Sequence, residues 1–290
     1  MTTTTMKKTA YHLLALLLLT ACNQVTPPAD SQQQADSLTA EAEPAALYDT
    51  KPSQAPNGLE IPKTTKGSEG RILRRVGYTT SYNAQNRIPN WVGWHLTASH
   101  VSGRYHRSGE MFHEDTDVSS PRAYDSDYRG SGFDRGHMCP SGDNKWDRKA
   151  QEQSFLFTNI CPQHHGLNAG AWNDVELQCR AWAKRYDGLY IVCGPVLYDR
   201  QHRTIGRNRV VVPEAFFKVV LRKQGNNCHA LGFLYENKSA SRNMSRYVRS
   251  VDEIERLTGL DFFSQLPDDI EEKIEKQADL RDWYPLREIK

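Results

Sequence analysis

The 290-residue sequence has no apolar run of the roughly 18 residues that a membrane-spanning helix needs, so we expect no such helix. It has no C-x-x-C spacing, which disfavours a zinc site, and no internal repeat is evident. It also lacks a strong excess of either charge, because 37 Lys and Arg stand against 35 Asp and Glu. Taken alone, the net charge of +2 argues against a strongly basic nucleic-acid binder and against an acidic solvating chain.

The composition supports a folded core. Hydrophobic residues make up 38% of the chain and aromatic residues 10%, which excludes wholesale disorder. The length fits one large domain or two small ones. Charge is segregated along the chain: +2 over 1–22, −5 over 23–60, +11 over 61–250 and −6 over 251–290. The basic central body suits a polyanionic partner, although an ordinary solvated surface would have the same composition.

The N-terminus has the pattern of a secretory signal peptide. Lys7 and Lys8 precede the apolar run 13–19, and a small residue and a cysteine follow. The segment 19–22, Leu-Thr-Ala-Cys, resembles the bacterial lipobox, which implies a lipoprotein signal peptide over 1–21 and lipid attachment at Cys22. The alternatives are an ordinary signal peptide with an incidental cysteine and a buried helix.

This resemblance implies an exported bacterial lipoprotein of the cell envelope, held on a membrane by its lipid. The outer membrane is favoured because Asn23, rather than Asp, follows the cysteine. Residues 22–59 are rich in Pro, Ala, Ser and Gln, so we expect a flexible tether. The main domain is expected over 60–265. An acidic C-terminal tail, which we expect to be helical, follows over 266–290.

Strands and helices are predicted without a regular βαβ alternation, which favours an α+β fold. Apolar and β-branched runs predict strands at 88–97, 189–196, 215–221 and 228–236, with the last two joined as a hairpin by the turn at 224–227. Helices are predicted at 146–155, 168–187 and 246–257. Between the first strand and the first helix, residues 101–132 read as a long polar loop, a feature that is often functional.

One short segment concentrates chemically active side chains. Asp134, Arg135, Gly136 and His137 are consecutive. Histidine can accept a proton from water near neutral pH, and arginine can neutralise phosphate oxygens. Glycine lets the backbone turn or approach a ligand closely. The group suits attack on a phosphodiester, whereas a charged turn with a surface histidine is the structural alternative.

A second group follows on the helix predicted at 168–187. Asn168, Trp172, Glu176 and Arg180 are spaced four apart and form one stripe on a helix. Amide and carboxylate oxygens are ligands that Mg²⁺ prefers. Because eight residues span roughly 12 Å along a helix, we expect Asn168 to bind the metal directly and Glu176 to bind it through water. An amphipathic helix whose polar residues face solvent is the alternative. In either case we expect Trp172 to pack in the core.

These motifs resemble the DNA/RNA non-specific endonucleases, the family that includes mitochondrial endonuclease G. The family's Asp-Arg-Gly-His signature matches 134–137, and its Asn-x-x-x-Trp-x-x-x-Glu helix with a later Arg matches 168–180. Its Asn-Ile-x-Pro-Gln segment matches 159–163. The resemblance covers roughly residues 70–260.

The resemblance implies a ββα-metal nuclease fold with a central antiparallel sheet flanked by helices. It also implies a metal-dependent endonuclease that hydrolyses DNA and RNA without sequence preference, using Mg²⁺, with Mn²⁺ as a substitute. The implied roles are general base for His137, direct metal ligand for Asn168, water-mediated ligand for Glu176, phosphate contacts for Arg135 and Arg180, and site support for Asn159. The positive field of the metal and Arg135 is expected to keep His137 unprotonated.

Other features leave alternatives open. A second basic pair, Arg104 and Arg107, either grips the nucleic-acid backbone or is solvated. The pair His164 and His165 either binds metal or lies in a loop without function. In an exported protein, five cysteines allow two disulfides and one spare thiol, with the pairing unassigned: Cys139, Cys161, Cys179, Cys193 and Cys228. The oligomeric state is open, with a homodimer as one option. The alternative function is a surface lipoprotein that binds extracellular nucleic acid with little cleavage.

Overall fold

The computed structural model describes residues 58–67, 69–107, 109–198, 201–225 and 227–284. The predicted signal peptide, Cys22 and residues 22–57 of the predicted tether lie outside these residues. Within the described ranges, no helix is both long and apolar enough to cross a membrane.

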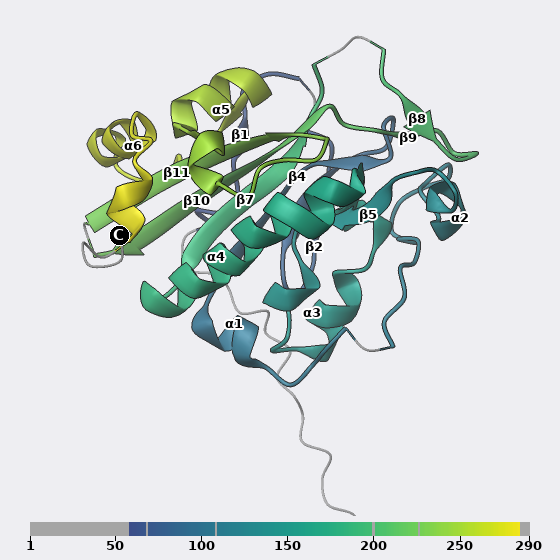
Figure 1. Ribbon diagram of the computed structural model, residues 1–290, viewed down its shortest axis with the longest axis horizontal. Coiled ribbons are helices and arrows are strands. Elements are labelled where there is room, and N and C mark those ends of the chain that lie inside the picture. The colour runs from purple at the N-terminus through teal and green to yellow at the C-terminus, as the bar shows by residue number, and fades with distance from the viewer. Residues whose placement is uncertain (1–57, 68, 108, 199–200, 226, 285–290) are drawn as a thin grey trace, which may run out of the picture. The chain divides into compact units, whose positions relative to one another are not determined.

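A seven-stranded sheet of the described residues forms the centre of the fold, and its neighbouring strands are all antiparallel (Figure 1). In spatial order its strands are β12 (Val248–Arg249), β11 (Asn227–Glu236), β10 (Ala215–Gln224), β7 (Leu189–Val196), β4 (Ile88–Leu96), β3 (Thr79–Asn83) and β2 (Arg71–Arg74). The predicted strands are confirmed, and the strand predicted at 215–221 continues to Gln224. The predicted hairpin of β10 and β11 is also confirmed.

Side-chain alternation along β10 gives the sheet two buried faces. Phe216 packs in one core with Trp172 and Trp182, and the helix α4 (Asn173–Arg185) covers this face. Phe217 packs in the other core with residues of α5 (Val251–Thr258) and α6 (Asp268–Glu275). Figure 1 shows α4 running across the sheet. The molecule is therefore an α+β structure with helices on both faces of an antiparallel sheet.

A separate small hairpin carries the Asp-Arg-Gly-His segment. It consists of β5 (Asp134–His137) and β6 (Ile160–Gln163), which are antiparallel, with His137 opposite Ile160. The chain then enters a helical region that begins at His165. Two antiparallel strands followed by a helix form the ββα unit that the family resemblance implies.

Short elements complete the described structure. They are the pair β1 (Lys63–Thr64) with β13 (Leu260–Asp261), the pair β8 (Thr204–Ile205) with β9 (Val210–Val211), the helices α1 (Ala98–Ser102), α2 (Asp125–Tyr128) and α3 (Arg148–Gln153), and the 3-10 turns Ser141–Asp143, Phe157–Asn159, Met244–Tyr247 and Leu280–Trp283. The predicted loop 101–132 is largely irregular, with α2 near its end.

The helix predicted over 168–187 is not one regular helix. Residues Leu167–Trp172 form a π-helical segment, and Gly170 has the non-helical dihedrals φ −108° and ψ −117°. Regular α-helix begins only at Asn173. Asn168 therefore lies before the irregularity, and the prediction of one continuous stripe from Asn168 to Glu176 is wrong. π-bulges of this kind are frequent at functional sites.

The predicted possibility of two disulfides is not realised among the described residues. All five described cysteines are free and buried: Cys139, Cys161, Cys179, Cys193 and Cys228. Each behaves as a small apolar side chain within the core, and burial raises the pKa of its thiol. These thiols are therefore protonated and poorly reactive in the folded protein.

Thiol titration tests this arrangement. In a Cys22→Ser variant purified without reductant, we expect almost no reaction with Ellman's reagent in buffer, because the thiols are buried. In guanidinium chloride we expect all five thiols to react. Recovery of only one or three thiols after unfolding would show that disulfides form.

Candidate active site

The side chains of Asp134–His137 lie alternately on the two faces of the small hairpin. Successive side chains alternate along β5, so Asp134 and Gly136 lie on one face, and Arg135 and His137 lie on the other. A Cβ atom at Gly136 would overlap the side chain of Gln163 on the paired strand. Glycine is therefore required at this position by close packing of the hairpin.

His137 lies in an apolar pocket. Its ring centroid is 5.2 Å from that of Phe112 and 5.1 Å from that of Phe155, and its Nε2 atom is buried without a hydrogen-bond partner in the described structure. Burial, and secondarily the charge of Arg107, lowers the pKa of His137 to about 3. The imidazole is therefore neutral near pH 7 and can accept a proton.

The positive charge that lowers the pKa of His137 belongs to Arg107 and not, as the sequence predicts, to Arg135. The Arg107 guanidinium lies over the rings of Phe112 and Phe155, at 5.7 and 5.6 Å from their centroids. Arg135 is not among the causes of the pKa shift at His137, so that part of the prediction is wrong. The sequence indicated Arg107 only as one of a basic pair. It gave no sign that the long loop before β5 brings this residue close to His137.

Arg135 is held in place by α2. Its Nε atom donates to Asp125 Oδ1 at 2.7 Å, and Nη2 donates to the Asp125 carbonyl oxygen at 3.2 Å. The guanidinium also lies over the rings of Phe112 and Tyr128, 5.7 and 5.6 Å from their centroids. These contacts fix the direction of the side chain, and Asp125 is a positioning residue that sequence reasoning missed.

The amide of Asn168 is oriented by Asp134. Asn168 Nδ2 donates to Asp134 Oδ2 at 2.9 Å, and His165 Nδ1 lies 2.9 Å from the same oxygen. No hydrogen bond within the described part of the chain uses Asn168 Oδ1, so this oxygen remains available as a ligand. A neutral amide oxygen next to a carboxylate is a donor set that fits a hard cation such as Mg²⁺. Sequence reasoning gave Asp134 no separate role.

Glu176 and Arg180 belong to a more buried cluster. Arg180 Nη1 donates to Asp143 Oδ1 at 2.8 Å and lies 4.0 Å from Glu176 Oε2. Trp94 Nε1 donates to the other carboxylate oxygen of Asp143 at 3.1 Å. Burial raises the pKa of Glu176 to about 7, against the opposing charges of Lys218 and Arg180. Within the described residues, no hydrogen bond or ion pair joins Glu176 to Asn168.

Lys218 supplies a buried positive charge beneath this cluster. It is 1% exposed, and its ammonium nitrogen lies 5.0 Å from the ring centroid of Trp94 and 4.7 Å from that of Trp172. A buried ammonium requires nearby negative charge, which Asp143 and Glu176 provide. The prediction that Trp172 packs in the core is confirmed. The sequence gave no indication that Lys218, which lies within a predicted strand, is buried beneath the site.

Asn159 supports the end of β5. Its Oδ1 atom accepts from the Cys139 backbone N–H at 2.9 Å, and its Nδ2 atom donates to the carbonyl oxygens of Cys139 and Ser154 at 2.8 Å each. The residue is fully buried, so these bonds fix the backbone two residues after His137. The predicted role of support therefore has a defined geometry.

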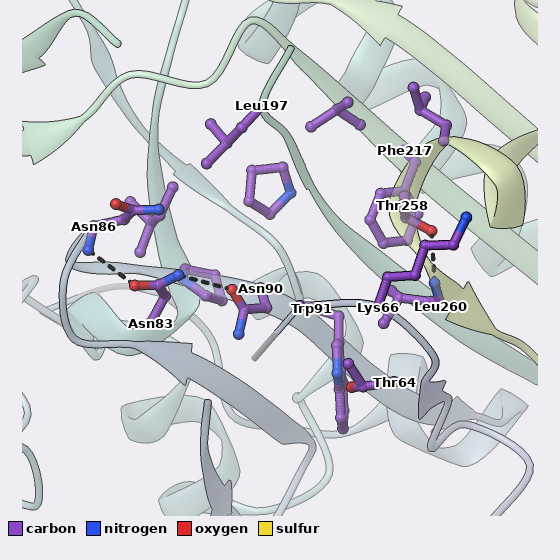
Figure 2. Close-up of a pocket in the computed structure, with 16 residues that line it drawn as sticks. Thr64, Lys66, Asn83, Asn86, Asn90, Trp91, Leu197, Phe217, Thr258 and Leu260 are labelled. Atoms are coloured by element: carbon purple, nitrogen blue, oxygen red, sulfur yellow. Dashed lines mark hydrogen bonds between the residues drawn. The ribbon is translucent and has the colours of Figure 1, made fainter. Parts of the chain in front are cut away.

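A cleft on the other face of the sheet is separate from this site. It encloses about 220 Å³ and is lined by residues that include Asn83, Asn90, Trp91, Phe217 and Thr258 (Figure 2). Trp91 and Phe217 belong to the core beneath α5. Asn83 Nδ2 donates to Asn90 Oδ1 at 3.1 Å. None of the predicted catalytic residues lines this cleft.

Comparison with known proteins identifies the family. The sequence profile of the DNA/RNA non-specific endonucleases matches residues 56–269. The mitochondrial nuclease EXOG of Mus musculus is 33% identical over 216 residues, which cover 69% of this chain and 58% of the mouse protein. The mitochondrial endonuclease G of Bos taurus is 32% identical, with 70% and 72% covered. Nuclease C1 of Cunninghamella echinulata var. echinulata is 34% identical, with 69% and 85% covered.

A solved structure agrees with these sequences. The crystal structure of an EndoG/EndoGI complex, described as showing the mechanism of EndoG inhibition, contains a chain with 32% sequence identity and a TM-score of 0.64. The match covers 69% of this chain and 89% of that chain. The chain thus spans little more than half of mouse EXOG but most of a structurally similar nuclease. It belongs to the DNA/RNA non-specific endonuclease family and has the ββα-metal nuclease fold.

Proposed function

We propose that this protein is a metal-dependent endonuclease that hydrolyses DNA and RNA without sequence preference. The observation that carries the proposal is the pair of prepared groups on the ββα unit. His137 is held neutral in an apolar pocket, and Asn168 has its carbonyl oxygen left available by the hydrogen bond to Asp134. A general base and a metal ligand on one small unit suit phosphodiester hydrolysis.

His137 is the group that activates water in this mechanism. Its neutral ring accepts a proton from the water that attacks phosphorus, and the ring becomes cationic. The phosphodiester brings negative charge next to the imidazole, and a nearby opposite charge favours the protonated form. Substrate binding therefore raises the basicity of a histidine whose pKa is low in the free protein.

Asn168 would hold Mg²⁺, or Mn²⁺ in its place, with Glu176 in contact through water. The ion would stabilise the charge that develops on the phosphate and the leaving oxygen. Arg135 and Arg180 would add positive charge at the phosphate, and their partners Asp125 and Asp143 fix their positions. Asn159 would keep the backbone after His137 rigid.

Nucleic acid of either sugar type fits the charge distribution. The segment 61–250 carries a formal charge of +11. Arg107, held beside His137 by two phenyl rings, is placed to contact a phosphate, and Arg104 lies in the same loop. No base-reading motif is visible in the sequence, so contacts with the backbone would dominate. The named relatives are nucleases, which gives no support to a binding protein with little cleavage.

The proposed location is the bacterial cell envelope, with a lipid on Cys22 and the outer membrane favoured. The lipobox-like segment 19–22 supports this proposal. Fractionation of cells that express either the tagged protein or its Cys22→Ser variant tests this location. Recovery of the unaltered protein in the soluble periplasm would remove the lipid anchor from the proposal.

Digestion of plasmid DNA and RNA tests the chemistry. We expect cleavage with Mg²⁺, loss of cleavage in EDTA, and a fall of about 10²- to 10⁴-fold in His137→Ala, the usual contribution of general-base catalysis. His229→Ala is the control, because His229 lies on β11 away from the site residues. Cleavage that survives both EDTA and His137→Ala would contradict the mechanism. Salt-sensitive binding without any cleavage would favour the binding protein instead.

Asp134→Asn tests the orientation of Asn168. Removing the carboxylate that accepts from Asn168 Nδ2 should raise the Mg²⁺ concentration needed for half-maximal activity by about 10- to 100-fold, because partners behind metal ligands have effects of this size. Asp174→Asn is the matched control, since Asp174 is paired with Arg242 on the surface of α4. An unchanged Mg²⁺ dependence in Asp134→Asn would refute the role given to Asp134.

His137 should also affect acid stability. The unfolded chain binds a proton at this histidine below a pKa near 6.5, whereas the folded protein does so only near 3. Protonation therefore favours unfolding as the pH falls from about 6.5 to 3, by on the order of 3 kcal/mol at pH 4. In EDTA, His137→Gln should lose Tm less steeply than the parent protein over this range. Parallel Tm profiles for the two proteins would count against a buried, neutral His137.

A further inference from the structure

Acidic side chains converge between α5 and α6. Asp252 and Glu255 lie three residues apart on α5, so they share one face of that helix. Glu275 ends α6. One carboxylate oxygen from each of these three residues lies within 4.8 Å of the other two. The cluster belongs to the face of the sheet opposite α4 and contains no residue of the candidate active site.

Glu275 gives this cluster a feature that surface carboxylates lack. Its side chain is only 6% exposed, and its Oε1 atom is buried without a hydrogen-bond partner in the described structure. Glu271 Oε1, one turn earlier on the same helix, is also buried without a partner. None of the ion pairs among the described residues includes Asp252, Glu255 or Glu275. A buried carboxylate oxygen without a partner requires either a proton or a cation.

The carboxylates of the cluster repel one another when they are ionised. Burial, followed by the surrounding carboxylates, raises the pKa of Glu275 to about 9. Burial and the carboxylates of Asp261 and Asp252 also raise the pKa of Glu255, to about 7, although the Phe262 backbone N–H donates to Glu255 Oε1 at 2.8 Å. A bound cation would offset this repulsion and allow the carboxylates to ionise together.

We propose that Asp252, Glu255 and Glu275 form a second cation site, which binds one divalent ion through carboxylate oxygens. Ca²⁺ fits best. It takes six to eight oxygen ligands at about 2.3–2.6 Å in flexible geometry, so three carboxylate oxygens within 4.8 Å of one another can bind one ion without a fixed arrangement. Mg²⁺ demands a tighter octahedron with oxygens at about 2.0–2.1 Å. Asp252 and Glu255 are partly exposed, which leaves room for water ligands.

The site would fasten the acidic C-terminal segment to the domain. A cation between α5 and α6 joins two helices that pack on the same face of the sheet. The chain after α6 continues to Trp283, whose ring centroid lies 4.7 Å from that of Trp182 on α4. Tyr186, the residue that follows α4, donates from its Oη to the Trp283 carbonyl oxygen at 2.9 Å. Holding α6 in place would therefore also stabilise the contact of the C-terminal segment with α4.

Thermal unfolding of the full chain in an Asn168→Ala background tests the proposal, because that substitution removes the proposed catalytic metal ligand. We expect Ca²⁺ to raise the Tm of Asn168→Ala by roughly 5–10 °C at a hundredfold excess over Kd. Calorimetric titration should show one equivalent of Ca²⁺. Adding Glu275→Gln should abolish the shift, because the amide removes a carboxylate ligand.

Glu272→Gln is the matched control, because Glu272 lies on α6 but is exposed and paired with Lys276. It should keep the full response to Ca²⁺. If Glu275→Gln fails to fold, Asp252→Asn replaces it, with the same expected loss. The proposal is overturned if Ca²⁺ does not shift the Tm of Asn168→Ala, or if the shift persists in Glu275→Gln or Asp252→Asn. Neither result would bear on cleavage through His137 and Asn168.

Discussion

The hydrogen bond from Asn168 to Asp134 joins the two halves of the site. It connects the first residue of β5 with the irregular turn that precedes α4, two segments 34 residues apart. An amide that donates to a carboxylate must present its oxygen elsewhere, so this one contact fixes both the position and the direction of the proposed metal ligand, the Asn168 carbonyl oxygen. The rest of the unit serves the same hairpin: Gly136 permits its close packing, and Asn159 holds the backbone where it ends.

The residue types of the site could be predicted from the sequence, but their environment could not. The Asp-Arg-Gly-His segment and the residues from 168 to 180 show which side chains are present, and apolar and β-branched runs show the main strands. The irregular turn at Gly170 was missed because four-residue spacing assumes a regular helix. The charge beside His137 was assigned to Arg135 because that residue is near in sequence. Arg107 approaches through the aromatic packing of a long loop, for which no periodic pattern exists.

Burial shifts the pKa values of His137 and Glu176 in opposite directions. It disfavours the charged form in each case, so it keeps His137 neutral and ready to accept a proton, while it raises the pKa of Glu176 to about 7. Lys218 and Arg180 oppose the effect at Glu176 and favour its anion. The buried lysine between Trp94 and Trp172 therefore belongs to the electrostatics of the site, although it lies beneath it.

The sheet also separates two charged clusters: one combines Lys218 and Arg180 with Asp143 and Glu176, and the other is purely acidic. The cluster around Lys218 lies on the α4 face, whereas Asp252, Glu255 and Glu275 lie with the helices of the other face. Layers on opposite faces of one sheet are roughly 20 Å apart, taking about 10 Å for each packing distance. This separation exceeds the Debye length of about 8 Å at physiological salt, so the acidic helices repel bound phosphate only weakly. An acidic C-terminal segment is therefore compatible with the proposed nucleic-acid site on the same domain, because its charges lie on the opposite face of the sheet.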